Sequence, residues 1–418
     1  MNVNRFLKIF RFKPSISTDT RLLKEGDIFF ALKGENFNGN IYVKDALNKG
    51  ASYAVTEDNR WKGRENVIVV EDVLDYLQKV ARAYRESLRC KVIAITGTNG
   101  KTTTKELCYS VLNTLYRTHA TKGNLNNHIG VPLTILSAPT NIDLMIVEMG
   151  ANHIGEIDTL CHIADPDIGL ITNIGKAHLE GFGSLEGVIT AKTELYKYLI
   201  ERKRTIIYNA QDEILKNNIP IEYRHKLKYL DADVIAIHPF IELLVEGNNY
   251  TSTLFGTYNV TNILCAITLA KYFDVPVNKI QQSLKDYTSN NNRSEIRNYL
   301  GATVVMDAYN ANPTSMEASL ASFAEGEGGR KIVVLGDMLE LGEFSHDEHQ
   351  NIYDLACKLG FEEIILIGKE FSKIDNTCKT FKSVLEAKPY FDTLNFSDLI
   401  ILIKGSRGIK LERLIEGP

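Results

Sequence analysis

A glycine-rich segment, TGTNGKTTTKE at residues 96–106, carries residue types suited to holding a phosphate. It follows a short apolar run and precedes a helical pattern, so its backbone N–H groups and the positive end of the helix would face an anion. Lys101 would reach the terminal phosphates, and the Thr102 hydroxyl would hold Mg²⁺. The general P-loop pattern has glycine where this sequence has Ile95, and the first glycine here is Gly97. We predict nucleotide binding; the alternative is a glycine-rich turn before a lysine-bearing helix.

Two acidic residues end other apolar runs. Glu148 follows the run at 144–147 and could supply a carboxylate oxygen to Mg²⁺, which takes one or two such ligands beside phosphates and water. The alternative is a solvated surface residue. Asp307 ends the run at 302–306 and could hold a ribose hydroxyl, whereas a polar loop with Asn turns is the simpler interpretation of the residues after it.

Four further positions are ambiguous from spacing alone. Asn259 stands near the start of a helical pattern and could face a ligand, or it could simply cap the helix. His178 is a single histidine in a polar loop. His346 and His349 are three residues apart without cysteine or further histidine at ligand spacing, which favours helix packing or capping over metal binding.

The elements that must position these residues are predicted from short apolar runs that alternate with helical patterns. Continuous apolar runs of about five residues are typical of buried parallel strands in an α/β fold, and ligands bind beyond the carboxyl ends of such strands. The predicted strands are 92–96, 144–147, 168–172, 205–207, 302–306, 331–335, 363–367 and 399–403.

Two breaks divide the chain. An amphipathic helical pattern at 73–88 ends just before the first strong strand, which predicts a break near residue 89. The Asn-rich stretch at 288–295 predicts a linker and a second break near residue 292. The predicted domains are 1–88, 89–291 and 292–418.

Composition limits the function classes. The 418 residues carry a net charge of −4 and 44% hydrophobic residues, which argues against a general nucleic-acid binder, a membrane-surface protein or a fibrous protein. The six cysteines form no Cys-x-x-Cys pair, so a reducing cytoplasmic location is expected. No apolar run approaches the ~20 residues of a membrane span, and no secretory signal is apparent.

Several motifs resemble those of the Mur ligase family and occur along the chain in the family's order. The resemblance is in particular to the branch that adds D-alanyl-D-alanine to UDP-N-acetylmuramoyl-tripeptide. The resemblance covers essentially the whole chain. The glycine-rich segment at 96–106, here called the ATP loop, resembles the family's own version of the P-loop pattern. The branch is indicated by STDTR at 17–21, the YNANP form of the Asp307 segment and GDMLELG at 336–342. The other matching motifs are FFALKGENFNG at 29–39, GNLNNHIGVPL at 123–133, EMGANHIGEI at 148–157, NIGKAHLEGFGS at 173–184, AKTEL at 191–195 and KGSRG at 404–408.

The resemblance implies an α/β protein of three domains: a small N-terminal domain for the UDP-linked substrate, a central P-loop ATPase with a mostly parallel sheet, and a Rossmann-like C-terminal domain that closes over ATP and binds the incoming dipeptide. The implied activity is ATP-dependent peptide-bond formation through an acyl phosphate, in peptidoglycan synthesis. Two Mg²⁺ ions, a cytoplasmic monomer, and no nucleic-acid or membrane partner are expected. The alternatives are a related ligase adding a diamino acid to the UDP-muramoyl-dipeptide, and an inactive nucleotide-binding module.

The resemblance also assigns roles residue by residue. Implied catalytic residues are Lys101, Glu148, His178 and Lys192, the last as a carbamate. Implied metal ligands are Thr102, Glu148, His178 and Lys192. Implied ATP contacts are Gly97, Thr98, Asn99, Gly100, Lys101, Thr102, Thr103, Asn259, Arg293 and Asp307. Thr20 and Arg21 would contact the uridine diphosphate, and Asn124 and Asn127 the muramyl peptide. The family usually has His where this chain has Tyr258, so a group that titrates near neutrality is lost there.

Overall fold

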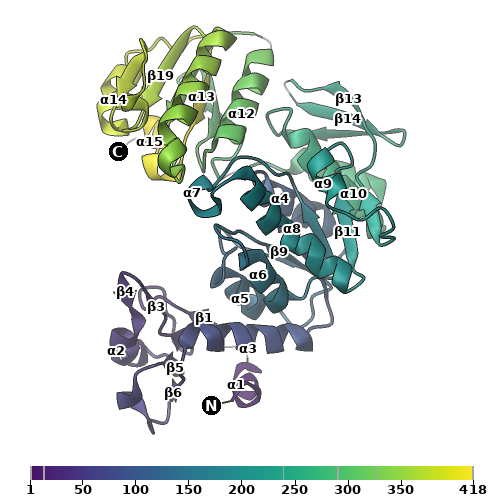
Figure 1. Cartoon of the computed structure of the whole chain (residues 1–418), viewed down its shortest axis with the longest axis vertical. Helices are drawn as coiled ribbons and strands as arrows, with labels where there is room; N and C mark the ends of the chain where they lie inside the picture. The colour runs from purple at the N-terminus through teal and green to yellow at the C-terminus, as the bar shows by residue number, and fades with distance from the viewer. Residues whose placement is uncertain (1, 13–14, 239, 290, 327, 417–418) are drawn as a thin grey trace.

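The computed structural model describes residues 2–12, 15–238, 240–289, 291–326 and 328–416. The molecule is elongated, with the N-terminal part at one end, the C-terminal part at the other, and the ATP-loop part between them (Figure 1). Each of the three parts is built on a mainly parallel sheet. This is the predicted three-part α/β architecture.

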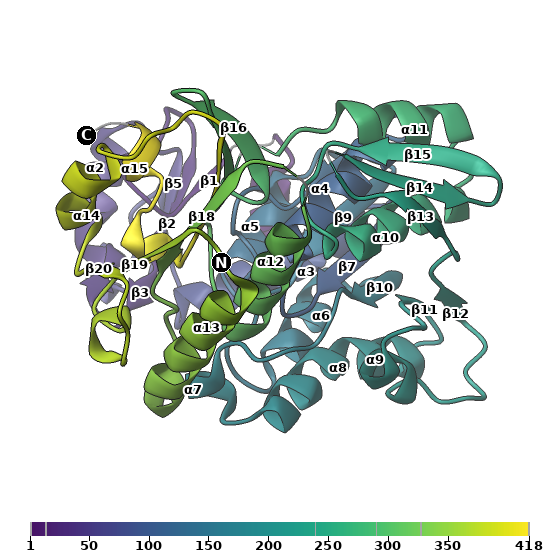
Figure 2. The same cartoon turned by 90° about the horizontal axis from the view of Figure 1, so that it is seen from above.

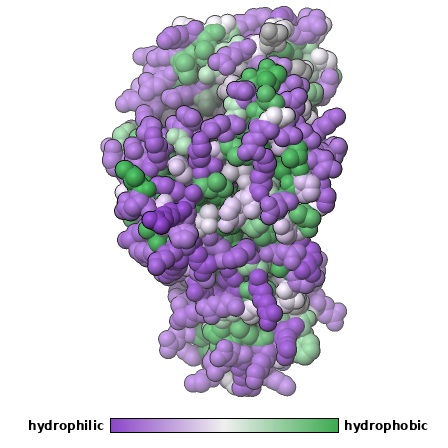
Figure 3. All heavy atoms as spheres, turned by 90° about the vertical axis from the view of Figure 1, so that its right-hand side faces the viewer, coloured by the Kyte–Doolittle hydropathy of each residue, from purple (hydrophilic) through white to green (hydrophobic). Residues whose placement is uncertain are grey.

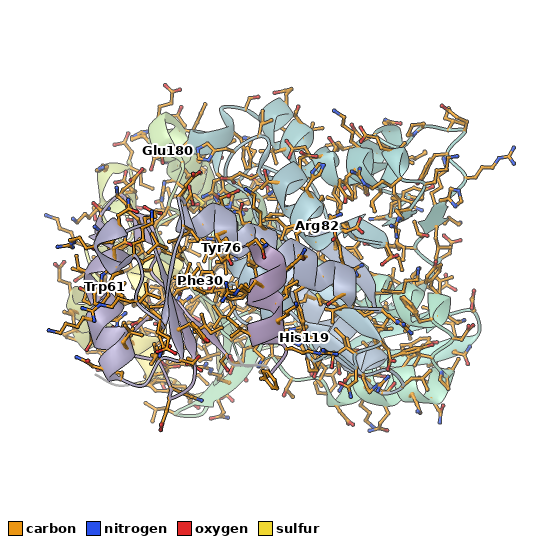
Figure 4. All side chains as sticks on the ribbon, turned by 90° about the horizontal axis from the view of Figure 1, so that it is seen from below. Phe30, Trp61, Tyr76, Arg82, His119 and Glu180 are labelled. Atoms are coloured by element: carbon orange, nitrogen blue, oxygen red, sulfur yellow. The ribbon has the colours of Figure 1, made fainter. Side chains whose placement is uncertain are left out.

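The N-terminal part contains a parallel sheet in the order β1-β2-β5-β6, with a two-stranded hairpin, β3-β4, beside it. Helix α1 lies across α3, where the rings of Phe6, Phe30 and Tyr76 form a buried cluster with centroids 5.8 to 6.5 Å apart (Figure 4). The elements are α1 Val3–Phe10, β1 Ile16–Ser17, β2 Ile28–Phe30, β3 Lys33–Gly34, β4 Phe37–Asn38, η1 Gly39–Tyr42, α2 Val43–Asn48, β5 Tyr53–Thr56, η2 Asn59–Trp61, β6 Val67–Val69 and α3 Val73–Ser87.

Helix α3 connects this sheet to the middle part. Its predicted apolar stripe is buried, and the Asp72 side chain caps its N-terminus by accepting from the Asp75 backbone N–H. Leu77 and Val80 belong to one continuous core with Val131 of α5, and α3 also packs against α6. The predicted 1–88 domain therefore shares its core with the middle part, and the boundaries at 89 and 292 stay predictions.

The middle part has a six-stranded parallel sheet in the order β12-β11-β10-β7-β9-β8. The apolar runs predicted as strands here are all strands, because they are buried on both faces. The helical pattern after the glycine-rich segment predicts an apolar face of Leu107, Cys108, Val111, Leu112 and Leu115; this is wrong at its end, since α4 stops at Leu112 and Leu115 is exposed. The elements are β7 Lys91–Thr96, α4 Lys101–Leu112, β8 Thr118–Ala120, α5 Gly130–Ser137, β9 Leu144–Glu148, α6 Glu156–Ala164, β10 Ile168–Ile171, α7 Leu179–Phe182, α8 Leu185–Glu201, β11 Thr205–Tyr208, α9 Glu213–Asn217 and β12 Lys226–Lys228.

A small antiparallel sheet, β13-β14-β15, follows in the chain and packs beside α11 and α10 (Figure 2). It was not predicted, because its strands alternate polar and apolar residues and lack the continuous apolar runs of the parallel sheets. The side of the molecule that carries it is mainly hydrophilic, with small separate hydrophobic areas (Figure 3). The elements are β13 Asp233–Ala236, β14 Ile241–Val245, β15 Asn248–Ser252, α10 Asn259–Tyr272 and α11 Val277–Asp286.

The C-terminal part has a six-stranded sheet in the order β16-β17-β21-β18-β19-β20, in which only β16 is antiparallel to its neighbour. The predicted strands are confirmed, while the polar edge strands β16 and β20 were not foreseen. The elements are β16 Glu295–Tyr299, β17 Ala302–Asp307, α12 Pro313–Glu325, β18 Arg330–Gly336, η3 Gly342–Phe344, α13 Ser345–Leu359, β19 Glu363–Ile367, η4 Phe371–Lys373, β20 Lys379–Phe381, α14 Val384–Phe391, β21 Leu399–Lys404, η5 Arg407–Ile409 and α15 Arg413–Glu416. Across the described ranges, no helix is long and apolar enough to cross a bilayer.

The carboxyl edges of the middle and C-terminal sheets face each other. Loops that follow β7 and β10 contact loops and helices that follow β17 and β18, as the position of α7 below α12 and α13 shows (Figure 1). Since ligands bind beyond the carboxyl ends of parallel strands, the fold directs two sets of binding loops toward one shared space.

Candidate active site

The ATP loop has a backbone shape that only glycine allows at two positions. Gly97 has φ of 141°, and a Cβ there would lie 2.1 Å from the Thr172 hydroxyl oxygen. Gly100 has φ of 76°, and a Cβ there would lie 2.7 Å from the side-chain oxygen of Asn262. Both glycines are therefore required by close approach as well as by backbone conformation.

The loop is held from both sides. Thr98 donates its backbone N–H to the carbonyl of Asn173, and Asn99 donates its own to the Asn173 side-chain oxygen, each at 2.9 Å. On the other side, the side-chain amides of Asn99 and Asn312 exchange two hydrogen bonds of 3.3 and 2.8 Å. Asn312 is the N-cap of α12, so this pair joins the ATP loop directly to the C-terminal part.

Lys101 is the first residue of α4, and its ammonium folds back onto the loop. It donates to the carbonyl oxygens of Gly97 at 2.7 Å and Thr98 at 2.9 Å. Burial lowers the pKa of Lys101 to about 8; Glu148 opposes this shift and Arg293 adds to it. Among the described residues, no side chain caps the N-terminus of α4. A half-buried cation beside uncapped backbone N–H groups is suited to an anion such as a phosphate.

Glu148 is buried at the end of β9, only 1% exposed, so the surface alternative is wrong. One carboxylate oxygen accepts from the Thr102 hydroxyl at 3.2 Å and from the Asn126 side-chain amide at 2.8 Å. The other oxygen is buried and has no hydrogen-bond partner among the described residues. Thr102 and Thr103 lie buried in the first turn of α4. An anionic oxygen without a donor, beside a hydroxyl, fits a hard cation such as Mg²⁺.

The protein alone supplies few ligands for such a cation. Within the part of the chain that the structure describes, no group of three or more His, Cys, Asp or Glu side chains gathers at one point. Mg²⁺ usually keeps several waters and substrate phosphates in its shell, so one well-placed carboxylate is compatible with its binding.

Lys192 lies on the buried face of α8 and is 2% exposed. Its ammonium donates to the Ala151 carbonyl at 3.3 Å and stands 5.3 Å from the centre of the Phe182 ring. Burial, and secondly the nearby charge of Lys101, lowers the pKa of Lys192 to about 7. With this pKa, a large fraction of the amine is neutral at neutral pH, and the neutral amine is the form that can react with carbon dioxide. Carbamylation itself stays a prediction.

His178 lies where the middle and C-terminal parts meet. It has φ of 50° and precedes α7, and its Nδ1 contacts the carboxylate of Glu340 from the GDMLELG segment. This close contact with His178 lowers the pKa of Glu340. The implied role of His178 as a metal ligand stays a prediction.

Asn259 is the first residue of α10, and it does not cap the helix. Its side-chain N–H donates to the Phe255 carbonyl at 2.7 Å and to the Ser294 hydroxyl at 3.2 Å, so the capping interpretation is wrong. Its side-chain oxygen accepts from Asn262, which in turn accepts from the Thr104 hydroxyl. This chain of buried polar groups connects α10 to the helix that follows the ATP loop.

Tyr258, which replaces the usual histidine, is half-buried next to Asn259. Its hydroxyl shares a 2.8 Å hydrogen bond with the Ser294 hydroxyl, and burial, followed by the charge of Asp307, raises its pKa. The side chain therefore stays neutral and connects α10 to the start of the C-terminal part.

Asp307 and Arg293 lie together at the carboxyl edge of the C-terminal sheet. Asp307 accepts from the Lys404 ammonium at 2.6 Å, and both side chains are largely buried. The Arg293 guanidinium lies 3.7 Å from the centre of the Tyr309 ring, and its buried Nε has no hydrogen-bond partner in the described structure. Arg293 thus keeps donors for an anion, while Asp307 already holds a cation; their roles toward ATP stay predictions.

The residues implied for the UDP-linked substrate are mostly exposed. The Arg21 side chain is 84% exposed and pairs with Asp19 at 2.6 Å, and the Thr20 carbonyl accepts from Lys49. Asn124 is exposed, and the Asn127 side-chain oxygen accepts from the backbone N–H groups at the start of α5. The structure thus brings neither asparagine into contact with Glu148.

Sequence reasoning missed Asn126, which lies between those two asparagines and binds Glu148. It also missed Ser294, the common partner of Tyr258 and Asn259, and Glu340, the partner of His178. The sequence GNLNN at 123–127 was the available signal for Asn126. However, the sequence does not tell which of its three asparagines turns toward Glu148, because that depends on how the loop folds.

Three protein-family models match successive segments of the chain. They are described as the Mur ligase family catalytic domain, over residues 14–85, the Mur ligase middle domain, over 95–270, and the Mur ligase glutamate ligase domain, over 292–407.

Individual proteins match over nearly the full length. The chain is 36% identical to UDP-N-acetylmuramoyl-tripeptide–D-alanyl-D-alanine ligase of Bacillus subtilis, over 96% of this chain and 92% of that protein. It is similar to the crystal structure of MurF from Acinetobacter baumannii, with a TM-score of 0.84, 31% identity, and 96% and 92% of the two chains covered. The structure of MurF from Thermotoga maritima in complex with ADP matches with a TM-score of 0.84 and 27% identity, over 96% of each chain.

Proposed function

The chain belongs to the Mur ligase family, and from that premise we propose that it is an ATP-dependent ligase joining D-alanyl-D-alanine to UDP-N-acetylmuramoyl-tripeptide in peptidoglycan precursor synthesis. The observation that carries this proposal is the ATP loop, where the half-buried Lys101 lies beside Glu148 and its unpartnered oxygen. A half-buried ammonium held by backbone carbonyls, beside a buried carboxylate with one unpartnered oxygen, is suited to a ligand with phosphates and a cation.

The reaction has two steps. An oxygen of the tripeptide's terminal carboxylate attacks the γ-phosphorus of ATP, and the bond from that phosphorus to the oxygen bridging it to the β-phosphate breaks. The products are ADP and an acyl phosphate. The amine of D-alanyl-D-alanine then attacks the activated carbonyl carbon, an amide bond forms, and phosphate departs as the amine loses a proton.

Lys101 and the backbone N–H groups at the start of α4 stabilise the charge that spreads over the transferring oxygens. The loop is already held in shape by Asn173 and Asn312, so little reorganisation is needed when the phosphates bind. The opposed edges of the two sheets would exclude water, which otherwise hydrolyses the acyl phosphate.

Two Mg²⁺ ions would be held by Thr102, Glu148, His178 and carbamylated Lys192. When bound, the ions neutralise phosphate charge during transfer. Glu148 supports this assignment through its unpartnered oxygen, and Lys192 supports it through its low pKa, since only a carbamate would turn that amine into an anionic ligand.

The other parts of the substrates are assigned to the ends of the molecule. Thr20 and Arg21 would hold the uridine diphosphate, Asn124 and Asn127 the muramyl peptide, and Asn259, Arg293 and Asp307 the rest of ATP. The protein would act as a monomer in the cytoplasm, where the nucleotide substrates and reduced cysteines are expected.

One assay tests the proposal: phosphate release from ATP with UDP-N-acetylmuramoyl-tripeptide, comparing D-alanyl-D-alanine with single amino acids. We expect turnover with the dipeptide. Turnover only with UDP-muramoyl-dipeptide and a free diamino acid would assign the chain to another ligase of the family. No turnover with any pair, but retained ATP binding, would instead indicate a nucleotide-binding module.

A further inference from the structure

The segment after β10, which carries His178, is also seated on the first turns of α12 and α13. A Cβ on Gly175 would lie 2.7 Å from the Thr314 hydroxyl oxygen, so the two backbones approach closely. The Lys176 backbone N–H donates to that hydroxyl at 3.0 Å. Figures 1 and 2 both place α7, which follows this segment, beside the same helices.

An ion pair accompanies this close contact. The Lys176 ammonium donates to a Glu348 carboxylate oxygen at 2.8 Å. The Glu348 side chain is only 8% exposed, whereas that of Lys176 is 52% exposed. The carboxylate is thus the buried partner, and the lysine reaches it from the middle part of the molecule.

The unequal burial makes the contact depend on lysine. A buried carboxylate that loses its cation is strongly unfavourable, whereas a buried pair replaced by apolar side chains of similar size often is not. If the two parts separate, both charges return to water and neither is penalised. Loss of Lys176 alone should therefore disfavour the docked arrangement without affecting either part by itself.

We propose that Lys176 and Glu348 form a positioning pair for ligation, which holds the C-terminal part over the ATP loop and the segment that carries His178. Neither residue reaches the predicted reacting atoms. The pair acts through Asn312 and Arg293, which the docked C-terminal part brings to the ATP loop and its cation-binding groups. This inference rests on the proposed function for its kinetic consequence, but its structural consequence can be measured independently.

The kinetic test uses two single variants and one double variant. Lys176→Met should lower kcat/KM for ATP about tenfold or more and leave the affinity for the UDP-linked substrate unchanged, because only the docked state is affected. Glu348→Gln should have a smaller effect, since no charge is then left buried. Lys176→Met combined with Glu348→Met should recover most of the loss. Asp347→Asn is the matched control: it alters a neighbouring carboxylate of the same helix turn that is 86% exposed, and activity should not change.

Small-angle scattering gives the structural readout. Lys176→Met should have a larger radius of gyration than the unaltered protein, and the double variant should return toward the original value. Unchanged scattering and kinetics in Lys176→Met, or a double variant as impaired as that single one, would overturn the pairing. If the unaltered chain shows no ligase activity, the proposed function fails, but the scattering comparison still decides the pairing. Should Lys176→Met not fold, the charge reversal Lys176→Glu with Glu348→Lys supplies the same two measurements.

Discussion

The ATP loop and the N-terminal segment around Arg21 are both assigned to phosphate groups, yet they present their charges in opposite ways. At the ATP loop, burial lowers the pKa of Lys101 to about 8 and that of Lys192 to about 7. In the N-terminal segment, Arg21 is exposed, and its hydrogen bond to Asp19 lowers the pKa of that carboxyl to about 2. The first region holds ammonium groups that are hydrogen-bonded to backbone carbonyls rather than to a carboxylate, and the second holds a guanidinium already paired with a carboxylate at the surface.

This difference matches two different tasks. Electrostatic interactions in a buried, water-poor site are strong and can stabilise charge that moves during a reaction, but they cost folding stability. Exposed pairs are screened by water and salt, so they contribute little to stability and can exchange partners easily. We infer that the ATP loop is built for transition-state charge and the N-terminal segment for reversible substrate binding.

The largest expected effect is that of Lys101→Ala. Removing the ammonium that would neutralise the transferring phosphoryl group should lower kcat about a hundredfold to a thousandfold. Binding of the UDP-linked substrate, measured by calorimetry, should stay nearly intact because the N-terminal segment is remote in the fold. Lys91→Ala, at the opposite end of β7, is the control. Equal loss of ligation and substrate binding would mean that the loop is structural, which would break the comparison.

Lys192→Met should separate activity from stability. Ligation should fall, by less than in Lys101→Ala, while the free energy of unfolding near pH 7 should rise on the order of 1 kcal/mol, since a buried amine is replaced by an apolar side chain. The sign of this change follows from the pKa of Lys192. In the folded state the Lys192 ammonium loses its proton near pH 7, whereas in the unfolded state it does so near the higher, ordinary pKa of lysine.

The unaltered protein should therefore gain stability as pH rises above about 7, because the unfolded chain then binds more protons than the folded one. Urea unfolding at several pH values would show a weaker rise for Lys192→Met. A ¹³C NMR carbamate signal with labelled bicarbonate, absent in the variant, would support the carbamate. An unfolding free energy that does not increase would contradict the burial argument.

Asn126→Ala tests whether the orientation of the Glu148 carboxylate depends on its hydrogen bond to Asn126. Loss of the 2.8 Å hydrogen bond should let the carboxylate rotate and weaken apparent Mg²⁺ affinity about tenfold in activity titrations. Asn127→Ala is the comparison variant: that side chain binds backbone N–H groups of α5, so at saturating UDP-linked substrate its apparent Mg²⁺ affinity should not change. Equal Mg²⁺ affinities in the two variants would show that Asn126 does not orient the carboxylate.

The smallest effect is expected for Arg21→Ala. Because the guanidinium is exposed, its removal should raise KM for the UDP-linked substrate a few-fold, with kcat and KM for ATP unchanged. The difference from the unaltered protein should shrink as salt increases. A fall in kcat would show that this surface residue contributes to the chemical step, and the contrast between the two regions would fail.

The sequence by itself determined the α/β class, the parallel strands and the ATP loop, since each depends on residues adjacent in the chain. Apolar runs such as 92–96 and 302–306 can be buried only between layers, and Gly97 and Gly100 permit the loop that follows. The expected activity came from the family resemblance, which depends on many motifs occurring in a fixed order along the chain.

Tertiary structure decided which polar groups meet. Asn126, Glu148 and Lys192 are far apart in the chain, and local propensity carries no information about which of several asparagines or lysines turns inward. The lowered pKa of Lys192 and the unpartnered oxygen of Glu148 arise from burial, a property of the packed molecule. The same holds between the middle and C-terminal parts: the contacts of Asn99 with Asn312 and of Lys176 with Glu348 exist only because two sheets face each other across one site.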